Sequence, residues 1–347
     1  MIENKLVLKN INHAYATKQS IKKICLTVEP GEIVCILGPS GAGKTTLLKL
    51  IAGFESPSSG EILIGNRILS GEKKSIPVEK RGVGMLFQDI ALFPHLNVNE
   101  NIGFALTSDK IGSKSKTVKK YLETINLLHI KDRYPHQISG GEQQRVALLR
   151  ALAANPAAML LDEPFSSLDV WTKFEVALEV ISFLKKSNTP TLMVTHDPQE
   201  AMRLSDRILV MIEGKVIDEG TPNKLYSNPA TPFSARISGP STIIKSKSNK
   251  GVLETAFGEI NLSKAEENKL YKIFIRPEAF HFTYEKNKGT NIKIKNLTNL
   301  GGYCLVNITI KNKKLIENVF LPSSIISDLE NNAKLLFNQD WAFVFPI

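Results

Sequence analysis

The sequence predicts a mixed α/β domain followed by a small all-β barrel, and three observations support this fold class. Short apolar segments alternate with helix-like stretches through the first 220 residues, as in domains built on a parallel or mixed sheet. Residues 227–240 are rich in Pro, Ser, Asn and Gly, which is typical of a boundary between domains. Beyond them, short β-type runs separated by turn residues favour a barrel.

The clearest predicted strand is Ile33–Leu37, which leads through a Gly-rich turn into a predicted helix over Thr45–Ala52. Ala158–Leu161 and Thr191–Val194 are also short and apolar, and turn or polar residues bound them. This is the pattern of strands that are buried on both faces. We therefore expect these three strands to lie in the middle of one sheet.

More polar segments between these strands predict helices. Residues 97–136 carry two apolar-periodic stretches, and Ser108–Lys116, rich in Ser and Lys, is expected to be an exposed loop. We predict a helical subdomain over about residues 89–157, within a first domain of residues 1–238, and a barrel over residues 239–347. The predicted barrel strands are Val252–Phe257, Lys272–Ile275, Asn291–Lys295, Cys304–Ile310 and Trp341–Phe345.

Composition excludes several classes of protein. No apolar run approaches the roughly 18 residues of a membrane-spanning helix, and the N-terminus shows no signal-peptide pattern. The formal net charge of +10 is spread over both predicted domains, whereas nucleic-acid binders more often concentrate basic residues on one patch. The three cysteines share no metal or redox spacing. We expect a soluble protein of the reducing cytoplasm without a nucleic-acid partner.

A phosphate-binding loop lies between the first predicted strand and its helix. The P-loop pattern is complete in the run Gly38-Pro39-Ser40-Gly41-Ala42-Gly43-Lys44-Thr45. Its glycines let backbone N–H groups curl around phosphate oxygens, and the helix that follows directs its positive end at the same anion. In such loops Lys44 would reach the β- and γ-phosphates and the Thr45 hydroxyl would bind Mg²⁺. Kinases, GTPases and helicases share this loop.

Two further segments narrow the choice. They are Ile138-Ser139-Gly140-Gly141-Glu142-Gln143-Gln144-Arg145 and Ala158-Met159-Leu160-Leu161-Asp162-Glu163-Pro164. The first resembles the signature motif of ABC ATPases, and the second resembles their Walker B strand. The resemblance to the ABC ATPases of bacterial importers extends over residues 5–235. It implies a P-loop ABC ATPase domain that uses ATP and Mg²⁺.

The signature segment implies a dimer. A glycine pair at a helix start makes an anion-facing N-terminus, and Ser139 adds a hydroxyl donor. Because the chain already has one phosphate loop, the resemblance implies that Ser139, Gly140, Gly141 and Glu142 face the ATP of a partner subunit, with two ATP molecules between two copies. An ordinary Ser helix cap would explain Ser139, but we expect it to leave the residues after it unexplained.

The two carboxylates after the Walker B strand predict the catalytic centre. Asp162 closes a buried strand, where an unpaired carboxylate is costly and Mg²⁺ would remove that cost. Glu163 would position and polarise the attacking water, because positioning and charge stabilisation dominate phosphoryl transfer. A structural role for the adjacent pair is the alternative.

The resemblance assigns further roles outside these segments. His196 matches the switch histidine that senses the γ-phosphate, and Gln88 matches the glutamine that approaches Mg²⁺ and water. Asp169 matches the D-loop at the dimer interface, and Tyr15 matches the aromatic residue that stacks on adenine. The expected catalytic set is Glu163, His196, Gln88 and Lys44, and the expected Mg²⁺ ligands are Thr45, Gln88 and Asp162. The expected ATP contacts are Tyr15, Gly38, Pro39, Ser40, Gly41, Ala42, Gly43, Lys44, Thr45 and Thr46.

The C-terminal part favours import. Phe274-Ile275-Arg276-Pro277-Glu278 resembles the accessory OB-like barrel, the TOBE domain, of importer ATPases for sugars, polyamines, sulfate, molybdate and ferric iron. Residues 84–98 are most similar to ferric-iron and polyamine import ATPases, and ferric iron is our first hypothesis. The resemblance implies a two-subunit or fused permease, an indirect solute-binding protein, and a place at the cytoplasmic face of the inner membrane.

Two other classes remain as alternatives. A soluble ABC ATPase of DNA repair or translation would share the ATP site, but it usually carries a coiled-coil insertion or tandem cassettes. A regulatory ATP-binding module would lack the water-positioning carboxylate, whereas Glu163 is present.

Overall fold

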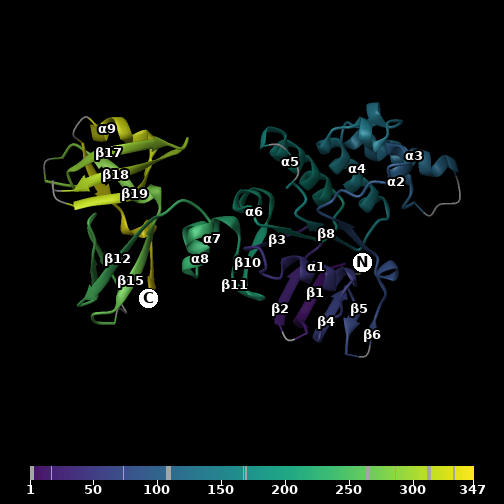
Figure 1. Ribbon diagram of the computed structural model, residues 1–347, viewed down its shortest axis with the longest axis horizontal. Coiled ribbons are helices and arrows are strands. Elements are labelled where there is room, and N and C mark those ends of the chain that lie inside the picture. The colour runs from purple at the N-terminus through teal and green to yellow at the C-terminus, as the bar shows by residue number, and fades with distance from the viewer. Residues whose placement is uncertain are drawn as a thin grey trace. The chain divides into compact units, whose positions relative to one another are not determined.

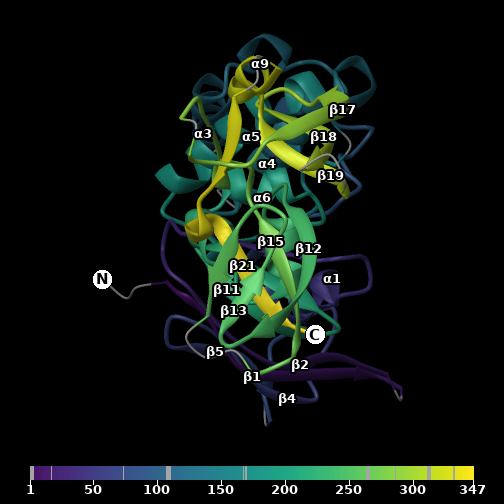
Figure 2. The ribbon, with the colours of Figure 1, turned by 90° about the vertical axis from the view of Figure 1, so that its left-hand side faces the viewer.

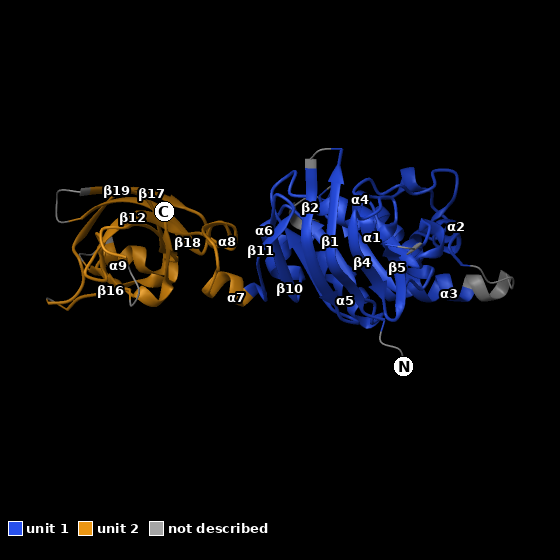
Figure 3. Ribbon diagram, turned by 90° about the horizontal axis from the view of Figure 1, so that it is seen from below, with its two compact units in different colours: residues 1–222 blue, residues 223–347 orange. Residues whose placement is uncertain are grey.

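The computed structural model divides the chain into two compact units, residues 1–222 and 223–347 (Figure 3). It describes residues 4–16, 18–72, 74–106, 111–166, 168, 170–262, 266–285, 287–310, 314–330 and 333–347. The boundary predicted after residue 238 falls later in the chain than this division. The two short helices α7 (Pro222–Ser227) and α8 (Pro232–Ile237) lie between these two positions.

The first unit is organised around a buried, mostly parallel sheet (Figure 1). Its strand order is β11 (Lys215–Gly220), β10 (Arg207–Ile212), β3 (Ile33–Leu37), β9 (Thr191–Thr195), β8 (Ala158–Asp162) and β7 (Val83–Leu86). Only the β10–β11 pair is antiparallel. Every residue of β3, β8 and β9 is buried, which confirms the three predicted central strands.

An antiparallel sheet lies against the same core. Its strand order is β2 (Lys18–Val28), β1 (Leu6–Tyr15), β4 (Ser59–Ile64), β5 (Arg67–Gly71) and β6 (Lys74–Ser75). One apolar cluster joins Leu8 of β1, Leu48 of α1 (Lys44–Ala52) and Leu160 of β8. The helix after the phosphate loop is therefore held between two sheets, which fixes the direction in which it begins.

Buried Arg81 fixes the other end of α1. Its guanidinium donates to the carbonyl oxygens of Leu50 and Ile51, both at 2.8 Å, so a cation meets the negative end of the helix. Burial lowers the pKa of Arg81. Gly53 is needed here because a Cβ would lie 2.4 Å from the Arg81 Nε and because its φ is +97°.

The remaining helices of the first unit include a group with a core of its own. The remaining helices are α2 (Val98–Gly103), α3 (Ile111–Thr124), α4 (Gly140–Ala153), α5 (Val170–Lys186), α6 (Pro198–Leu204), η1 (Val78–Lys80), η2 (Leu128–Ile130) and η3 (Pro135–Gln137). A cluster separate from the main core joins Ile102 of α2, Leu122 of α3 and Leu149 of α4.

The loop predicted over Ser108–Lys116 is wrong for residues 111–116, which belong to α3, while 108–110 lie outside the described residues. Polarity alone suggested a loop. Lysine is nevertheless a good helix former, and the buried Val118 and Leu122, four residues apart, anchor the same helix.

The second unit is rich in strands, as predicted, and its strands form three sheets. The orders are β14 (Glu259–Asn261), β13 (Val252–Glu254), β12 (Thr242–Asn249), β15 (Leu270–Ile275), β21 (Ala342–Pro346); then β16 (Phe280–Thr283), β20 (Lys334–Phe337); and β17 (Ile292–Asn299), β18 (Tyr303–Ile310), β19 (Lys314–Pro322). Short helices complete it: η4 (Pro277–Ala279), η5 (Ser323–Ile325), α9 (Ile326–Glu330) and η6 (Gln339–Trp341). One core joins Ile273, Phe280 and Val306 from the three sheets, and Figure 2 shows β12, β15 and β21 together.

Candidate functional site

The loop between β3 and α1 has a backbone that only glycine tolerates at two positions. Gly43 adopts a φ of +100°, and a Cβ there would lie 2.6 Å from the carbonyl oxygen of Ser20. A Cβ on Gly38 would lie 2.2 Å from the carbonyl oxygen of Met211. The backbones of β2 and β10 therefore lie directly against the loop, and α1 begins immediately after it.

Lys44, the first residue of α1, directs its side chain back to this loop. Its side chain is buried, and the ammonium donates to the carbonyl oxygens of Gly38 and Pro39 at 2.8 and 3.0 Å. Burial lowers its pKa, although the carboxylates of Glu163 and Asp162 oppose that change. The loop thus holds a positive charge at the start of a helix, which already favours anions.

Thr45 and Asp162 bring two oxygen atoms together beside the loop. The Thr45 hydroxyl donates to Asp162 Oδ1 at 3.2 Å, where the start of α1 meets the end of β8. Burial raises the pKa of Asp162, the Thr45 hydrogen bond lowers it, and Glu163 raises it further, for a net increase. A hydroxyl and a carboxylate are ligands that Mg²⁺ accepts, so these residues fit that cation.

Glu163 and His196 meet at the same edge of the sheet. They directly follow β8 and β9, which are parallel neighbours, and His196 Nδ1 lies 3.0 Å from Glu163 Oε2. Glu163 has a left-handed backbone with a φ of 45°, and its N–H donates to Val194 at 3.0 Å. Strained non-glycine residues concentrate at functional sites.

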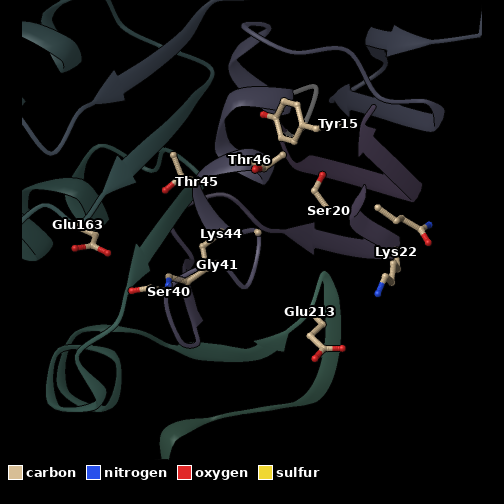
Figure 4. Close-up of a pocket in the computed structure, with 12 residues that line it drawn as sticks. Tyr15, Ser20, Lys22, Ser40, Gly41, Lys44, Thr45, Thr46, Glu163 and Glu213 are labelled. Carbon is tan, nitrogen blue, oxygen red and sulfur yellow. The ribbon is translucent and has the colours of Figure 1, made fainter. Parts of the chain in front are cut away.

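A pocket of about 830 Å³ connects several of these residues (Figure 4). From the predicted ATP contacts its lining includes Tyr15, Ser40, Gly41, Gly43, Lys44, Thr45 and Thr46, together with the predicted catalytic Glu163. Gly38, Pro39 and Ala42 belong to the loop without lining the pocket. The volume is within the range of sites for ligands of nucleotide size.

Four lining residues were missed by the sequence analysis. Gln19, Ser20 and Lys22 come from β2, and Glu213 comes from the turn between β10 and β11. Ser20 and Lys22 are two apart, so strand periodicity alone places them on one face. Nothing in the sequence indicated that this face borders the phosphate loop.

The signature segment forms the start of α4 and lies outside the lining of this pocket. Ser139 is the N-cap: its hydroxyl accepts from the Glu142 N–H at 3.3 Å, and Glu142 Oε2 accepts from the Ser139 N–H at 2.8 Å. Burial raises the pKa of Glu142, but the hydrogen bonds from Ser139 outweigh it and the net pKa is lowered. Capping therefore accounts for Glu142 as well as Ser139, which corrects the expectation that it explains Ser139 alone.

Two other predicted site residues are Gln88 and Asp169. Gln88 is exposed just after β7 and does not line the pocket. Asp169 lies outside the described residues. The roles predicted for these two residues therefore stay predictions.

Comparisons with known proteins agree on one family. The family model described as ABC transporter matches residues 21–166. The Fe(3+) ions import ATP-binding protein FbpC 2 of Haemophilus influenzae is 37% identical over 337 residues, which cover 94% of this chain and 95% of that protein. The sulfate/thiosulfate import ATP-binding protein CysA of Synechococcus elongatus is 42% identical, over 74% of each chain.

Solved structures show the same similarity. The cbiO1 protein of Clostridium perfringens, part of an ABC transporter complex, gives a TM-score of 0.60 at 29% identity, covering 65% of this chain and 92% of its own. An ATP-binding cassette solved as a dimer with ADP and Pi gives 0.55 at 30% identity, covering 62% and 98%. Across the described residues, no helix is long and apolar enough to span a bilayer.

Proposed function

Because the chain belongs to the ABC transporter family and is an import-type ATPase subunit, we propose that the pocket beside the phosphate loop is its ATP site. One observation carries this proposal: Lys44 and Thr45 at the start of α1 and Glu163, more than a hundred residues later in the sequence, line a single pocket. Together they offer a cation for phosphate, an oxygen ligand for a metal, and a carboxylate for water.

Each residue at the phosphate end has a distinct task in this proposal. The loop amides and Lys44 bind the phosphate oxygens, and the Lys44 ammonium moves from its own carbonyl partners to the nucleotide. Thr45 and Asp162 would hold Mg²⁺, which would supply positive charge for the phosphate oxygens. The expected ligand Gln88 would have to approach from its exposed position.

Glu163 and His196 act on the attacking water. The Glu163 carboxylate orients a water molecule and accepts its proton as the water oxygen bonds to the γ-phosphorus and the bond to the β–γ bridging oxygen breaks. His196, 3.0 Å from Glu163, donates to the γ-phosphate and holds the carboxylate in place. ADP and phosphate are the products.

The complete site requires a second copy of the chain. The start of α4, with Ser139, Gly140 and Gly141, offers backbone N–H groups outside this chain's own pocket. A similar cassette is a dimer with ADP and Pi. We therefore place these residues against the ATP of the partner, with Asp169 at the same interface, in a homodimer.

The dimer works with a separate membrane permease. The proteins similar to this chain are named as import ATP-binding proteins, and nothing in the described residues of this chain is able to span a membrane as a helix. We place the chain at the cytoplasmic face of the inner membrane, with Gln88 and the residues after it facing the permease. A two-subunit or fused permease and a solute-binding protein complete the system.

Ferric iron is the cargo that the comparisons favour. The Fe(3+) import relative aligns over 94% of the chain, whereas the sulfate relative aligns over 74% of it. Sulfate is the second candidate because its ATPase has the higher identity, 42% against 37%. Uptake of radiolabelled ferric iron and sulfate by cells with and without this gene separates them. Loss of iron uptake alone is expected, and loss of sulfate uptake alone would overturn the assignment.

The variant Glu163→Gln tests the catalytic assignment. It keeps the size of the side chain but removes the acceptor for the proton, so we expect ATP turnover to fall at least about a hundredfold. ATP should still bind and hold the variant as a dimer in gel filtration. Glu61→Gln is the matched control, because Glu61 is a partly exposed carboxylate on β4 that pairs with Lys9 at 3.5 Å. Unchanged turnover would disprove the role of Glu163, and a monomer with ATP would disprove the shared site.

A further inference from the structure

The end of the pocket away from Glu163 contains a hydrogen-bonded group that the proposed mechanism does not use. Figure 4 shows Tyr15 and Ser20 on one side of the pocket and Glu163 on the other. Tyr15 ends β1 and is 44% exposed, so few neighbours pack against its ring. An aromatic ring serves as a stacking platform only if its orientation is fixed before the ligand arrives.

The Tyr15 hydroxyl is held by a carboxylate. It donates to Glu55 Oε1 at 3.1 Å, a charge-assisted hydrogen bond. Glu55 follows the end of α1, where its own N–H donates to the Lys49 carbonyl oxygen at 3.3 Å. The Ser58 N–H donates to the Asn12 carbonyl oxygen at 2.8 Å, which ties this segment to β1. The carboxylate therefore stands on backbone that is fixed relative to Tyr15.

His13 supports the same pair from inside. Its side chain is buried, its Nδ1 pairs with Ser20 Oγ at 2.7 Å, and its Nε2 lies 3.9 Å from Glu55 Oε2. The imidazole is nearly perpendicular to the Tyr15 ring, with 4.5 Å between the ring centroids. His13 thus contacts the tyrosine ring directly and faces the carboxylate that binds the tyrosine hydroxyl.

We infer that Glu55, supported by His13, is a positioning residue that orients Tyr15 as the platform for the nucleotide base. This inference rests on the proposed ATP site. Glu55 does not touch the nucleotide in this arrangement. Because any base can stack on a tyrosine ring, the effect of Glu55 is on affinity and is the same for adenine and guanine. Hydrolysis at the distant Glu163 is left unchanged once the nucleotide is bound.

Equilibrium binding of a fluorescent ADP analogue to the full chain tests this inference. Tyr15→Phe and Glu55→Ala each remove the same hydrogen bond, so each is expected to raise the Kd roughly three- to tenfold. The double variant should be no weaker than the poorer single variant, because the two changes remove one interaction. Glu55→Gln keeps an acceptor oxygen and should restore most of the affinity. Glu61→Ala, which removes a partly exposed carboxylate on β4, should bind as wild type.

Steady-state kinetics give the second measurement. In Glu55→Ala the KM for ATP should rise with the Kd while kcat stays unchanged, and the ADP and GDP analogues should bind more weakly by the same factor. Effects that multiply in the double variant, or wild-type affinity in Tyr15→Phe, would overturn the inference. A selective loss of the adenine analogue in Glu55→Ala would overturn it too, since Glu55 would then read the base itself. Failure of the proposed function is distinguishable, because the wild-type chain would then bind no nucleotide.

Discussion

Replacing Arg276 by methionine tests how the second compact unit is held together where the chain enters it. Arg276 is completely buried, and its guanidinium donates to the carbonyl oxygens of Tyr226, Gly239 and Pro240 at 2.7–3.2 Å. It also lies over the Tyr226 ring at 4.3 Å. Burial lowers its pKa to about 10, so the group is still charged at neutral pH. One side chain thus joins the end of α7, the segment before β12 and the end of β15.

The size of the effect follows from the oxygens left behind. Each buried acceptor without a partner costs about 1–3 kcal/mol, and we take the low end because a small shift admits water. The three carbonyl oxygens then cost about 3 kcal/mol, and the lost cation–π contact adds about 1 kcal/mol. For a cooperative unit of this size 1 kcal/mol corresponds to about 4 °C, so a total of about 4 kcal/mol should lower the Tm by roughly 16 °C.

Differential scanning calorimetry of the full chain measures this change. Arg276→Lys keeps the charge but not the planar fork, so its Tm should lie between those of the methionine variant and the wild type. Arg236→Met is the control, because Arg236 is exposed on α8 of the same unit and should change the Tm by less than about 2 °C. If Arg276→Met melts with the wild-type profile, these hydrogen bonds do not hold the unit together.

Two further predictions concern the first unit. Lys173 pairs with Glu200 at 2.5 Å and with Asp197 at 3.0 Å, so Lys173→Met should destabilise the chain by about 2–4 kcal/mol in urea unfolding at neutral pH. Burial raises the pKa of Asp197, but hydrogen bonds from Lys173 and the backbone outweigh burial, so the net pKa is lowered. The stabilisation by this ion pair is therefore present above about pH 4, and it is lost as the pH falls through the lowered pKa. If Lys173→Met is destabilised relative to the wild type by the same free energy at pH 3 as at neutral pH, this assignment is wrong. Gly43→Ala places a Cβ 2.6 Å from the Ser20 carbonyl oxygen, so it should abolish the rise in Tm that ATP causes, and a wild-type thermal shift would show that the loop adapts.

Local signals were enough to predict the phosphate end of the site. A strand, a glycine-rich turn and a helix are adjacent in sequence, so β3, the loop and α1 needed no long-range information. Asp162, Glu163 and His196 were predictable for a related reason. Each stands at the carboxyl end of a buried strand, and parallel strands share that edge, so side chains far apart in sequence meet there.

The groups around Tyr15, at the end of the pocket away from Glu163, could not be predicted in this way. Glu55 lies after a helix, His13 lies inside a strand, and Glu213 lies in a turn, and none belongs to a sequence pattern. Their proximity to Tyr15 or to the loop depends on how β1 and β2 pair and on where α1 ends. The second unit shows the same limit: β12 and β19 alternate polar and apolar residues too weakly to predict strands without their partners.

The signature helix raises a question that its capping does not answer. Ser139 and Glu142 cap α4, yet the two glycines between them are poor helix formers. Within the described chain a Cβ on Gly140 would meet no heavy atom within 4 Å, and one on Gly141 would make only ordinary contact with Val176 at 3.5 Å. No crowding in the described residues therefore requires glycine here. Our proposal that a phosphate of a partner's nucleotide packs against the bare backbone would account for both glycines.

Gly140→Ala separates these two explanations. If only the single chain matters, alanine should be harmless or should stabilise α4 by about 0.5–1 kcal/mol, because it loses less backbone entropy than glycine. If a partner's nucleotide packs against the backbone, the same variant should fold normally, bind the ADP analogue normally, and yet lose ATP turnover and the ATP-dependent dimer. Turnover and dimerisation that match wild type in a well-folded Gly140→Ala chain would remove the reason for placing a second subunit at this helix.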